Sequence, residues 1–197
     1  MNLMTLNQES SNSATPPNDS DVQESITTFW STIAPFYNSD PGNVPSLESA
    51  EYQAWIRALE RYLPPPPADV LDIGTGTGFV ALIAGQLGHR ALGLDLSPAM
   101  LDEARRQAEE RGLKTSFQIG DAVKPPLEEA SLDAVVCRHF LWTLRRPEVA
   151  LANWLRLLRP RGRVVVIDGF WFAQARPEED FDLFDIFQRA RDENFFK

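Results

Sequence analysis

The sequence predicts an α/β fold with a doubly wound, mostly parallel, Rossmann-like sheet. Short apolar runs alternate with amphipathic helical stretches from residue 68 onward, which is the pattern of parallel strands joined by helical crossovers. A glycine-rich turn follows the first apolar run, where such sheets bind their ligands. The 197 residues also suffice for one α/β domain with its own core.

The chain is expected to divide into three parts. Residues 1–22 are rich in Asn, Ser, Thr, Pro and Gln, and this composition predicts a disordered tail. Residues 23–67 are expected to form an N-terminal helical cap and a linker that ends in a run of prolines. Residues 68–197 are expected to form the ligand-binding domain.

Apolar spacing predicts two helices in the cap. The first covers residues 24–34 and is expected to end at Pro35, which lacks a backbone N–H. The second covers residues 48–63. Trp30 and Phe36 are candidate walls of a ligand pocket, although the core is the favoured place for each. The inward face of the second helix is expected to carry Trp55, Leu59, Tyr62 and Leu63.

Strands and helices are expected to alternate through the rest of the chain. The predicted strands are 69–73, 90–95, 115–119, 133–137 and 163–168. The predicted helices lie near 78–87, 98–111, 147–158 and 178–192. Gly88 and Gly112 stand where helix C-terminal glycines belong, and Ser97 is an N-cap followed by Pro98 at the first helical position.

The glycine-rich turn is the strongest functional signal. Asp72 precedes Gly74, Gly76 and Gly78, a G-x-G-x-G pattern. The dinucleotide pattern G-x-G-x-x-G would instead place a glycine at Phe79. An acid at the end of the first strand suits a ligand with a positive amino group better than a pyrophosphate. S-adenosylmethionine (SAM) has such a group and no phosphate to seat on a helix N-terminus.

Two further acids follow the next two strands. Asp95 comes more than twenty residues after the turn, where a carboxylate can accept from both ribose hydroxyls, although it could also be a solvated strand-end acid. Met100 can lie over an adenine ring or fill the core. Asp121, followed by Ala122, can accept from an adenine amine or act as a loop acid.

These segments together resemble the class I SAM-dependent methyltransferases, and most closely the small-molecule group that includes the ubiquinone/menaquinone-type enzymes. The resemblance runs from about Ala68 to Asp168 through VLDIGTGTGF, GLDLSPAMLDEAR, IGDA, LDAVVCRHFLWTL and LLRPRGRVVVID. One departure is Arg161, where the family commonly has glycine. The resemblance implies that SAM binds at Asp72, Gly74, Thr75, Gly76, Gly78, Asp95, Leu96, Met100, Asp121, Ala122 and Arg138, with the backbone of Arg138 near the sulfonium.

The acceptor pocket is expected to draw on the N-terminal helices and on the loops after the fourth and fifth strands. Tyr37, Trp142 and Trp171 are candidate walls for an apolar or aromatic acceptor. His139 is the candidate general base if the acceptor proton must leave, since its ordinary pKa suits that task. In the alternative, His139 only shapes the pocket.

Composition limits the partners and the location. A net charge of −9 argues against a broad nucleic-acid-binding face. The single cysteine, Cys137, is expected to be a buried thiol in a reducing compartment, and His89 a surface residue. No metal-ligand cluster, membrane span or secretory signal is expected, so the sequence predicts a cytoplasmic protein without a bound metal.

The C-terminal part departs from the resembled family, whose sheet normally ends with a hairpin of two further strands. After Asp168 only Gly169–Phe172 and an amphipathic helix are expected, so the sequence is expected to be incomplete at this end. The sequence therefore favours a SAM-dependent methyltransferase that acts on a small molecule. The alternatives are an NAD-dependent oxidoreductase and a non-catalytic SAM-binding remnant.

Overall fold

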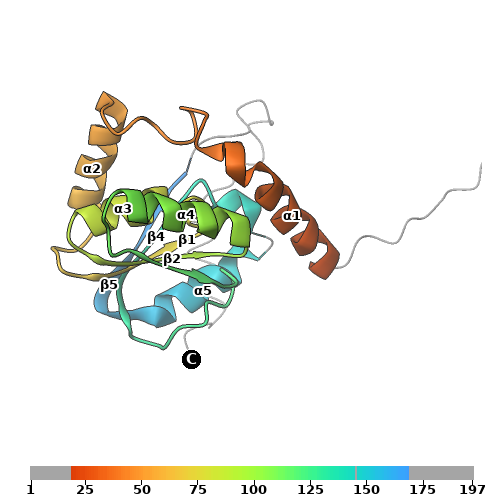
Figure 1. Ribbon diagram of the computed structural model, residues 1–197. Coiled ribbons are helices and arrows are strands. Elements are labelled where there is room, and N and C mark those ends of the chain that lie inside the picture. The colour runs from red at the N-terminus through yellow and green to blue at the C-terminus, as the bar shows by residue number, and fades with distance from the viewer. Residues whose placement is uncertain (1–18, 145, 169–197) are drawn as a thin grey trace, which may run out of the picture.

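A five-stranded parallel sheet lies at the centre of the computed structural model, which describes residues 19–144 and 146–168 (Figure 1). The strand order is β3-β2-β1-β4-β5 and every neighbouring pair is parallel, which confirms the predicted fold class. The strands are β1 (Asp69–Ile73), β2 (Arg90–Asp95), β3 (Ser116–Ile119), β4 (Leu132–Arg138) and β5 (Leu158–Ile167). The predicted boundaries of β1 and β2 are confirmed, whereas β5 begins at Leu158 rather than at residue 163.

Helices cover both faces of this sheet. On one face lie α3 (Phe79–Gln86) and α4 (Pro98–Glu110), and on the other lies α5 (Pro147–Leu157), as Figure 1 shows. A short 3₁₀ helix, η1 (Leu141–Thr143), follows β4. The predicted helix near 178–192 lies outside the described residues, as do Gly169–Phe172.

The core consists of two layers, one on each side of the sheet. Val70 of β1 packs in the layer that contains α3, whereas Leu71 packs in the layer that contains α5. Trp154 of α5 is fully buried in the second layer. Since both faces are covered, the central strands carry apolar side chains on both sides, as in the run Ala134–Cys137 of β4, which explains the apolar runs in the sequence.

The N-terminal helix α1 (Asp19–Tyr37) differs from the prediction at both ends. It begins inside the segment expected to be a disordered tail, and it contains Pro35 instead of ending there. Pro35 lies in the last turn, where its ring forfeits only the backbone bond to the carbonyl of Ser31, so the helix can continue. Phe36 is 72% exposed, so its prediction as a core residue is wrong.

The second cap helix, α2 (Ala50–Tyr62), confirms most of the predicted inward face, since Leu59 and Leu63 are buried and Trp55 packs against the same core. The Ser49 side chain caps it by accepting from the backbone N–H of Tyr52. Tyr52 and Leu59 are buried, whereas Tyr62 is 52% exposed and its inward assignment is wrong. Tyr62 is three residues after Leu59 and so lies near the same side, but it is the last residue of the helix, where its side chain can reach solvent.

Polar contacts fasten α1 to the sheet domain. The hydroxyls of Ser31 and Ser97 lie 2.8 Å apart. The Asn38 amide donates to Glu103 at 2.8 Å and accepts from the Thr77 hydroxyl at 2.6 Å. The end of α1 is therefore held against α4 and against the glycine-rich turn.

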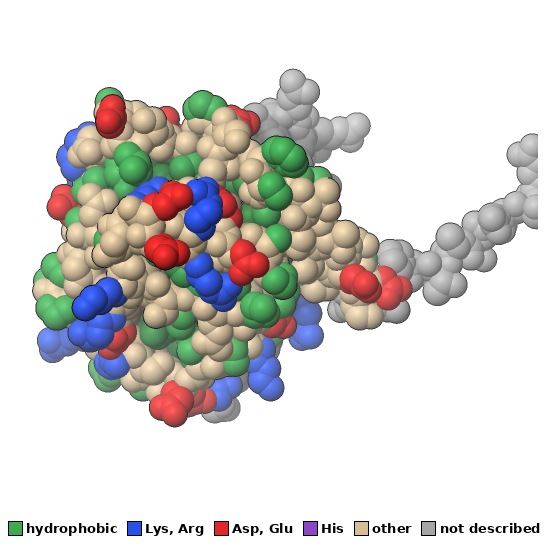
Figure 2. Space-filling model, in the orientation of Figure 1, with side chains coloured by type: hydrophobic (Ala, Val, Ile, Leu, Met, Phe, Trp, Pro, Cys, Tyr) green, Lys and Arg blue, Asp and Glu red, His purple; other side chains and the backbone are tan. Residues whose placement is uncertain are grey.

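Charged side chains of both signs are interspersed on the face shown in Figure 2. Over α4, Arg105 pairs with Asp102, and Arg106 pairs with Glu103 and Glu110. Among the helices of residues 19–144 and 146–168, none has the length and apolar character that crossing a membrane requires.

Two single residues complete the comparison with the sequence predictions. Cys137 is fully buried in β4, as expected, and burial raises the pKa of its thiol. His89 is 8% exposed, so its assignment as a surface residue is wrong. The backbone N–H of His89 donates to the carbonyl of Ala84, and this bond holds the residue against the end of α3. Burial lowers the pKa of its imidazole.

Candidate functional site

A cavity of about 410 Å³ opens at the carboxyl ends of the strands, beneath α1. This edge is where open parallel sheets bind ligands. Most of the sequence-predicted site residues line this cavity. They are Tyr37, Gly74, Gly76, Asp95, Leu96, Met100, Asp121, Ala122, Arg138 and His139. Asp72, Thr75, Gly78 and Trp142 do not line it, and Trp171 lies outside the described residues.

The glycine-rich turn provides the floor of the cavity. Gly74, Gly76 and Gly78 all have positive φ values, of 66°, 53° and 87°, which other residues adopt at a cost. A Cβ at Gly74 would lie 2.2 Å from the ring of Phe140. A Cβ at Gly76 would meet nothing within 4 Å. The free space for a ligand therefore lies above Gly76.

Asp95 joins the end of β2 to this turn. One carboxylate oxygen accepts from the Gly76 N–H and the other from the Ser97 N–H, both at 2.9 Å. Burial raises the pKa of Asp95, and these two backbone bonds oppose the rise. Each oxygen retains a further lone pair, so the carboxylate can accept from two hydroxyls of a ligand.

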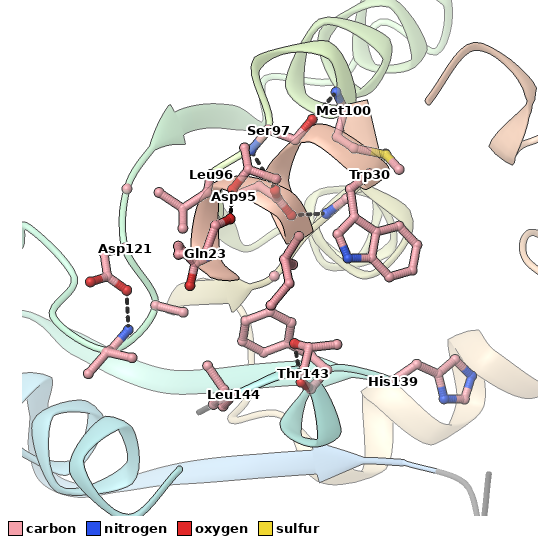
Figure 3. Close-up of a pocket in the computed structure, with 18 of the residues that line it drawn as sticks. Gln23, Trp30, Asp95, Leu96, Ser97, Met100, Asp121, His139, Thr143 and Leu144 are labelled. Atoms are coloured by element: carbon pink, nitrogen blue, oxygen red, sulfur yellow. Dashed lines mark hydrogen bonds between the residues drawn. The ribbon is translucent and has the colours of Figure 1, made fainter. Parts of the chain in front are cut away.

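The loop after β3 is fixed from behind by α5. The indole N–H of Trp154 donates to the carbonyl of Ala122 at 2.7 Å, and Asn153 donates to that of Val123 at 2.6 Å. Asp121 accepts from the Val123 N–H at 2.8 Å. In Figure 3, Asp121 stands at one side of the pocket and His139 at the other. The loop thus presents a fixed acid at the end of the cavity away from His139.

Asp72 lies under the turn rather than in the cavity wall. It is 2% exposed, and one of its oxygens accepts from both the Thr75 hydroxyl at 2.6 Å and the Ala81 N–H at 3.0 Å. Burial raises its pKa to about 7, because the effect of desolvation is larger than the lowering by the two hydrogen bonds. Gly78 also lies below the cavity, because its Cα packs against Ala104 and Phe117.

The Arg138 side chain fastens the cap to β4. Its guanidinium carbon lies 4.9 Å from the ring centre of Trp55 and 4.6 Å from that of Phe79. One terminal nitrogen donates to the carbonyl of Asn43 at 3.0 Å. Burial lowers the pKa of this guanidinium. The family resemblance implied a role for the backbone of Arg138 at the site, but not this use of its side chain.

His139 adopts a left-handed backbone conformation, with φ of 54°. Its N–H donates to the carbonyl of Ile167 at 2.9 Å, and its carbonyl accepts from the indole of Trp142 at 3.0 Å. Its Nδ1 lies 3.7 Å from a carboxylate oxygen of Asp168. Trp142 is 46% exposed and holds the backbone of His139, so the structure places it beside the cavity wall instead of in it.

Helix α1 contributes to the cavity wall, as the sequence led us to expect of the N-terminal helices. Trp30, expected in the core, lines the cavity and packs edge-on against Tyr37, with ring centres 6.1 Å apart. Figure 3 shows Trp30 projecting between Met100 and His139. The sequence left Trp30 as a candidate wall but favoured the core for it, because helical spacing alone does not show how α1 packs over the sheet. The other lining residues not predicted for the site include Gln23, Ile26, Thr27, Phe140, Thr143, Leu144 and Arg146.

Comparison with known proteins places these features in a family. Residues 71–166 match the methyltransferase domain family. The chain is 38% identical over 142 residues to the demethylmenaquinone methyltransferase of Thermus thermophilus, an alignment that covers 71% of this chain and 64% of the relative. The corresponding enzyme of Deinococcus radiodurans is 34% identical over 154 residues, covering 75% and 61%.

A solved structure supports the same assignment. Phosphoethanolamine N-methyltransferase 1 of Haemonchus contortus, solved with phosphoethanolamine and S-adenosylhomocysteine, matches with a TM-score of 0.61 and 26% identity. The match covers 76% of this chain and 33% of that one. The present chain spans somewhat less than two thirds of the length of the two curated relatives.

Proposed function

Since this chain belongs to the methyltransferase domain family through residues 71–166, we propose that it transfers a methyl group from SAM to a small-molecule acceptor. The observation that carries the proposal is the space above Gly76, whose N–H is bonded to Asp95. A glycine without neighbours at its Cβ position leaves room for a ligand, and the carboxylate beside it suits a ribose. This arrangement fits an adenosine with an amino-acid tail.

The residues present fit SAM along the length of the cavity. Asp121 and Ala122 would hold the adenine, with Met100 beside it, and Asp95 would hold the ribose. The methionine portion would lie over Gly74 and Gly76. The remaining proposed contacts of SAM, direct or through the turn, are Asp72, Thr75, Gly78, Leu96 and Arg138. When bound, SAM supplies a methyl group on a sulfonium, which is transferred by direct displacement.

The protein would contribute mainly alignment and exclusion of water. Trp30 and Tyr37 of α1 cover the cavity from above, and Phe140 closes it beside Gly74. Correct positioning of two reactants can lower a barrier by about 7–11 kcal/mol in favourable cases. A tightly covered site of this kind therefore suits a reaction whose leaving group is already good.

We propose an aromatic or partly apolar acceptor, with Tyr37 as one wall. Apolar side chains that line the cavity include Ile26, Trp30, Phe140 and Leu144. The two curated relatives are named for their action on demethylmenaquinone, an acceptor of this chemical class. Trp142 and Trp171 remain predictions as direct acceptor contacts.

The NAD-dependent alternative is not favoured. Its third glycine would fall at Phe79, which instead packs against Tyr52 and Trp55 at the start of α3. Replacing that ring with glycine would remove part of the contact between α2 and the sheet domain. The chain therefore lacks the glycine that allows close packing of helix on strand in a dinucleotide-binding turn.

Calorimetric titration of the purified chain with S-adenosylhomocysteine tests the proposal, with NAD as the control ligand. We expect micromolar binding of S-adenosylhomocysteine and none of NAD. Absence of binding by folded protein would contradict the cofactor assignment. Binding without turnover of any quinol or phenol would instead support the non-catalytic, SAM-binding alternative.

A further inference from the structure

Arg138 places a positive charge at one end of the cavity. It lines the cavity at the end of β4 and precedes His139, which Figure 3 shows on the side opposite Asp121. Its guanidinium carbon lies 4.6 Å from the ring centre of Phe79, the residue that follows Gly78 of the glycine-rich turn. Because the adenine is assigned to the end at Asp121, this charge stands at the end assigned to the amino-acid tail of SAM.

The described part of the chain supplies no counter-ion for this guanidinium. No Asp or Glu within residues 19–144 and 146–168 forms an ion pair with Arg138, and the hydrogen bond that it makes there goes to the neutral carbonyl of Asn43. Its Nε is buried and has no hydrogen-bond partner among these residues. A partly buried cation without a counter-ion is costly, so the site favours a ligand that brings a negative charge.

Two neighbouring side chains could carry such a charge, but neither neutralises Arg138. Burial lowers the pKa of Arg138, and among its ionisable neighbours Tyr37 and then Asp72 oppose this most. Burial raises the pKa of Tyr37, so its phenol stays uncharged at neutral pH. Asp72 has a pKa of about 7, and one of its oxygens is already engaged by Thr75 and Ala81.

We propose that the Arg138 guanidinium is the counter-ion for the carboxylate of the cofactor's amino-acid tail, and that it couples recognition of this carboxylate to the closed position of α2. This inference rests on the proposed function. A guanidinium presents several N–H donors in a planar fork that matches a carboxylate. SAM has one carboxylate and no other anionic group, so the pairing also fixes which end of the cofactor faces β4.

The coupling follows from what holds the guanidinium in place. Its carbon lies 4.9 Å from the ring centre of Trp55 in α2, and the Asn43 carbonyl in the loop before α2 accepts from it at 3.0 Å. These contacts exclude water from part of the cation, so its attraction for a carboxylate is stronger while they persist. By linkage, a bound carboxylate stabilises the same contacts.

Calorimetry with two ligands isolates the carboxylate. S-adenosylhomocysteine and decarboxylated S-adenosylhomocysteine share the adenosine, the sulfur and the amino group. We expect the full chain to bind the first at least about thirtyfold more tightly, and we expect Arg138→Met to reduce this ratio to about threefold or less. Any loosening of the cap in Arg138→Met weakens both ligands and cancels in the ratio. Arg57→Met removes an exposed cation from α2 and should leave the ratio unchanged.

Hydrogen exchange in the full chain tests the link to α2. With each ligand at saturation, the backbone amides of α2 should exchange more slowly with S-adenosylhomocysteine than with the decarboxylated ligand, and Arg138→Met should abolish this difference. Equal affinities of the unsubstituted protein for the two ligands, or an unchanged ratio in folded Arg138→Met, would overturn the carboxylate assignment. Equal exchange with the two ligands would overturn the link to α2. If neither ligand binds the unsubstituted protein, the proposed function itself fails.

Discussion

Replacement of Asp72 by Asn should stabilise the protein, and more so as the pH rises. The two donors to Asp72, the Thr75 hydroxyl and the Ala81 N–H, share a single carboxylate oxygen. An asparagine that presents its amide oxygen there keeps both bonds. The substitution therefore removes a buried charge without leaving either donor unpaired.

The magnitude follows from the raised pKa of Asp72, which is about 7 in the folded protein against 3.8 for an unperturbed aspartate. In the unfolded chain the carboxyl loses its proton near pH 4, whereas in the folded chain it keeps the proton until about pH 7. The folded state binds more protons across this window, so its stability falls as the pH rises through it. At about 1.4 kcal/mol per pH unit, the full cost above pH 7 is about 4 kcal/mol.

Urea unfolding, followed by the fluorescence of the five tryptophans, measures this effect. The free energy of unfolding of Asp72→Asn should exceed that of the unsubstituted protein by about 1 kcal/mol at pH 4.5 and by about 4 kcal/mol at pH 8.5. Any constant change in hydrogen bonding cancels in the difference of about 3 kcal/mol between the two pH values. A difference in free energy of unfolding that is the same at both pH values would refute the assignment of Asp72 as a buried carboxyl with a raised pKa.

Three further substitutions test other parts of the structure. Asp95→Ala removes the acceptor for two backbone N–H groups and for the proposed ribose, so calorimetry should show at least a tenfold loss of affinity for S-adenosylhomocysteine; unchanged affinity would contradict the site. Arg138→Met removes the contacts with Trp55 and Phe79 and should lower the free energy of unfolding by about 1–2 kcal/mol, whereas equal stability would show that these contacts contribute nothing. Replacing Arg161, which has a φ of 70°, with glycine should raise the free energy of unfolding by up to about 1 kcal/mol in urea unfolding. A decrease would contradict the inferred strain.

The sheet domain could be predicted from sequence because its signals are local. Apolar runs of strand length give β1 and β2 their correct ends, and Ser97 followed by Pro98 marks the start of α4. Gly88 and Gly112 have the positive φ values expected after helices. Each of these features depends on neighbouring residues alone, so it does not depend on how the rest of the chain packs.

The cap was predicted less well, because its helices are defined by what they pack against. Both Phe29 and Phe36 of α1 are mainly exposed, while Trp30 turns toward the cavity, although all three are equally apolar in the sequence. Tyr62 is exposed for the same reason on α2. Helical spacing identifies a possible inward face, but the packing partner decides which side is used.

The candidate site shows the same division. Carboxylates at strand ends could be assigned from topology, since the carboxyl ends of parallel strands meet at one edge of the sheet. This placed Asp95 and Asp121 correctly at the cavity. It could not show that Asp72 lies beneath the turn, since that depends on which way one side chain points after Gly74 bends the backbone.

His139 and Arg161 show why strain has to be considered together with its surroundings. Both have positive φ without being glycine, so both carry a similar conformational cost. Arg161 is an exposed residue at a position where the resembled family has glycine, and no described contact requires its side chain. His139 instead borders the cavity and faces Asp168. Replacement by glycine should therefore relieve strain at both positions. At His139 it should also remove the candidate general base, so only there should the gain in stability be accompanied by a loss of activity.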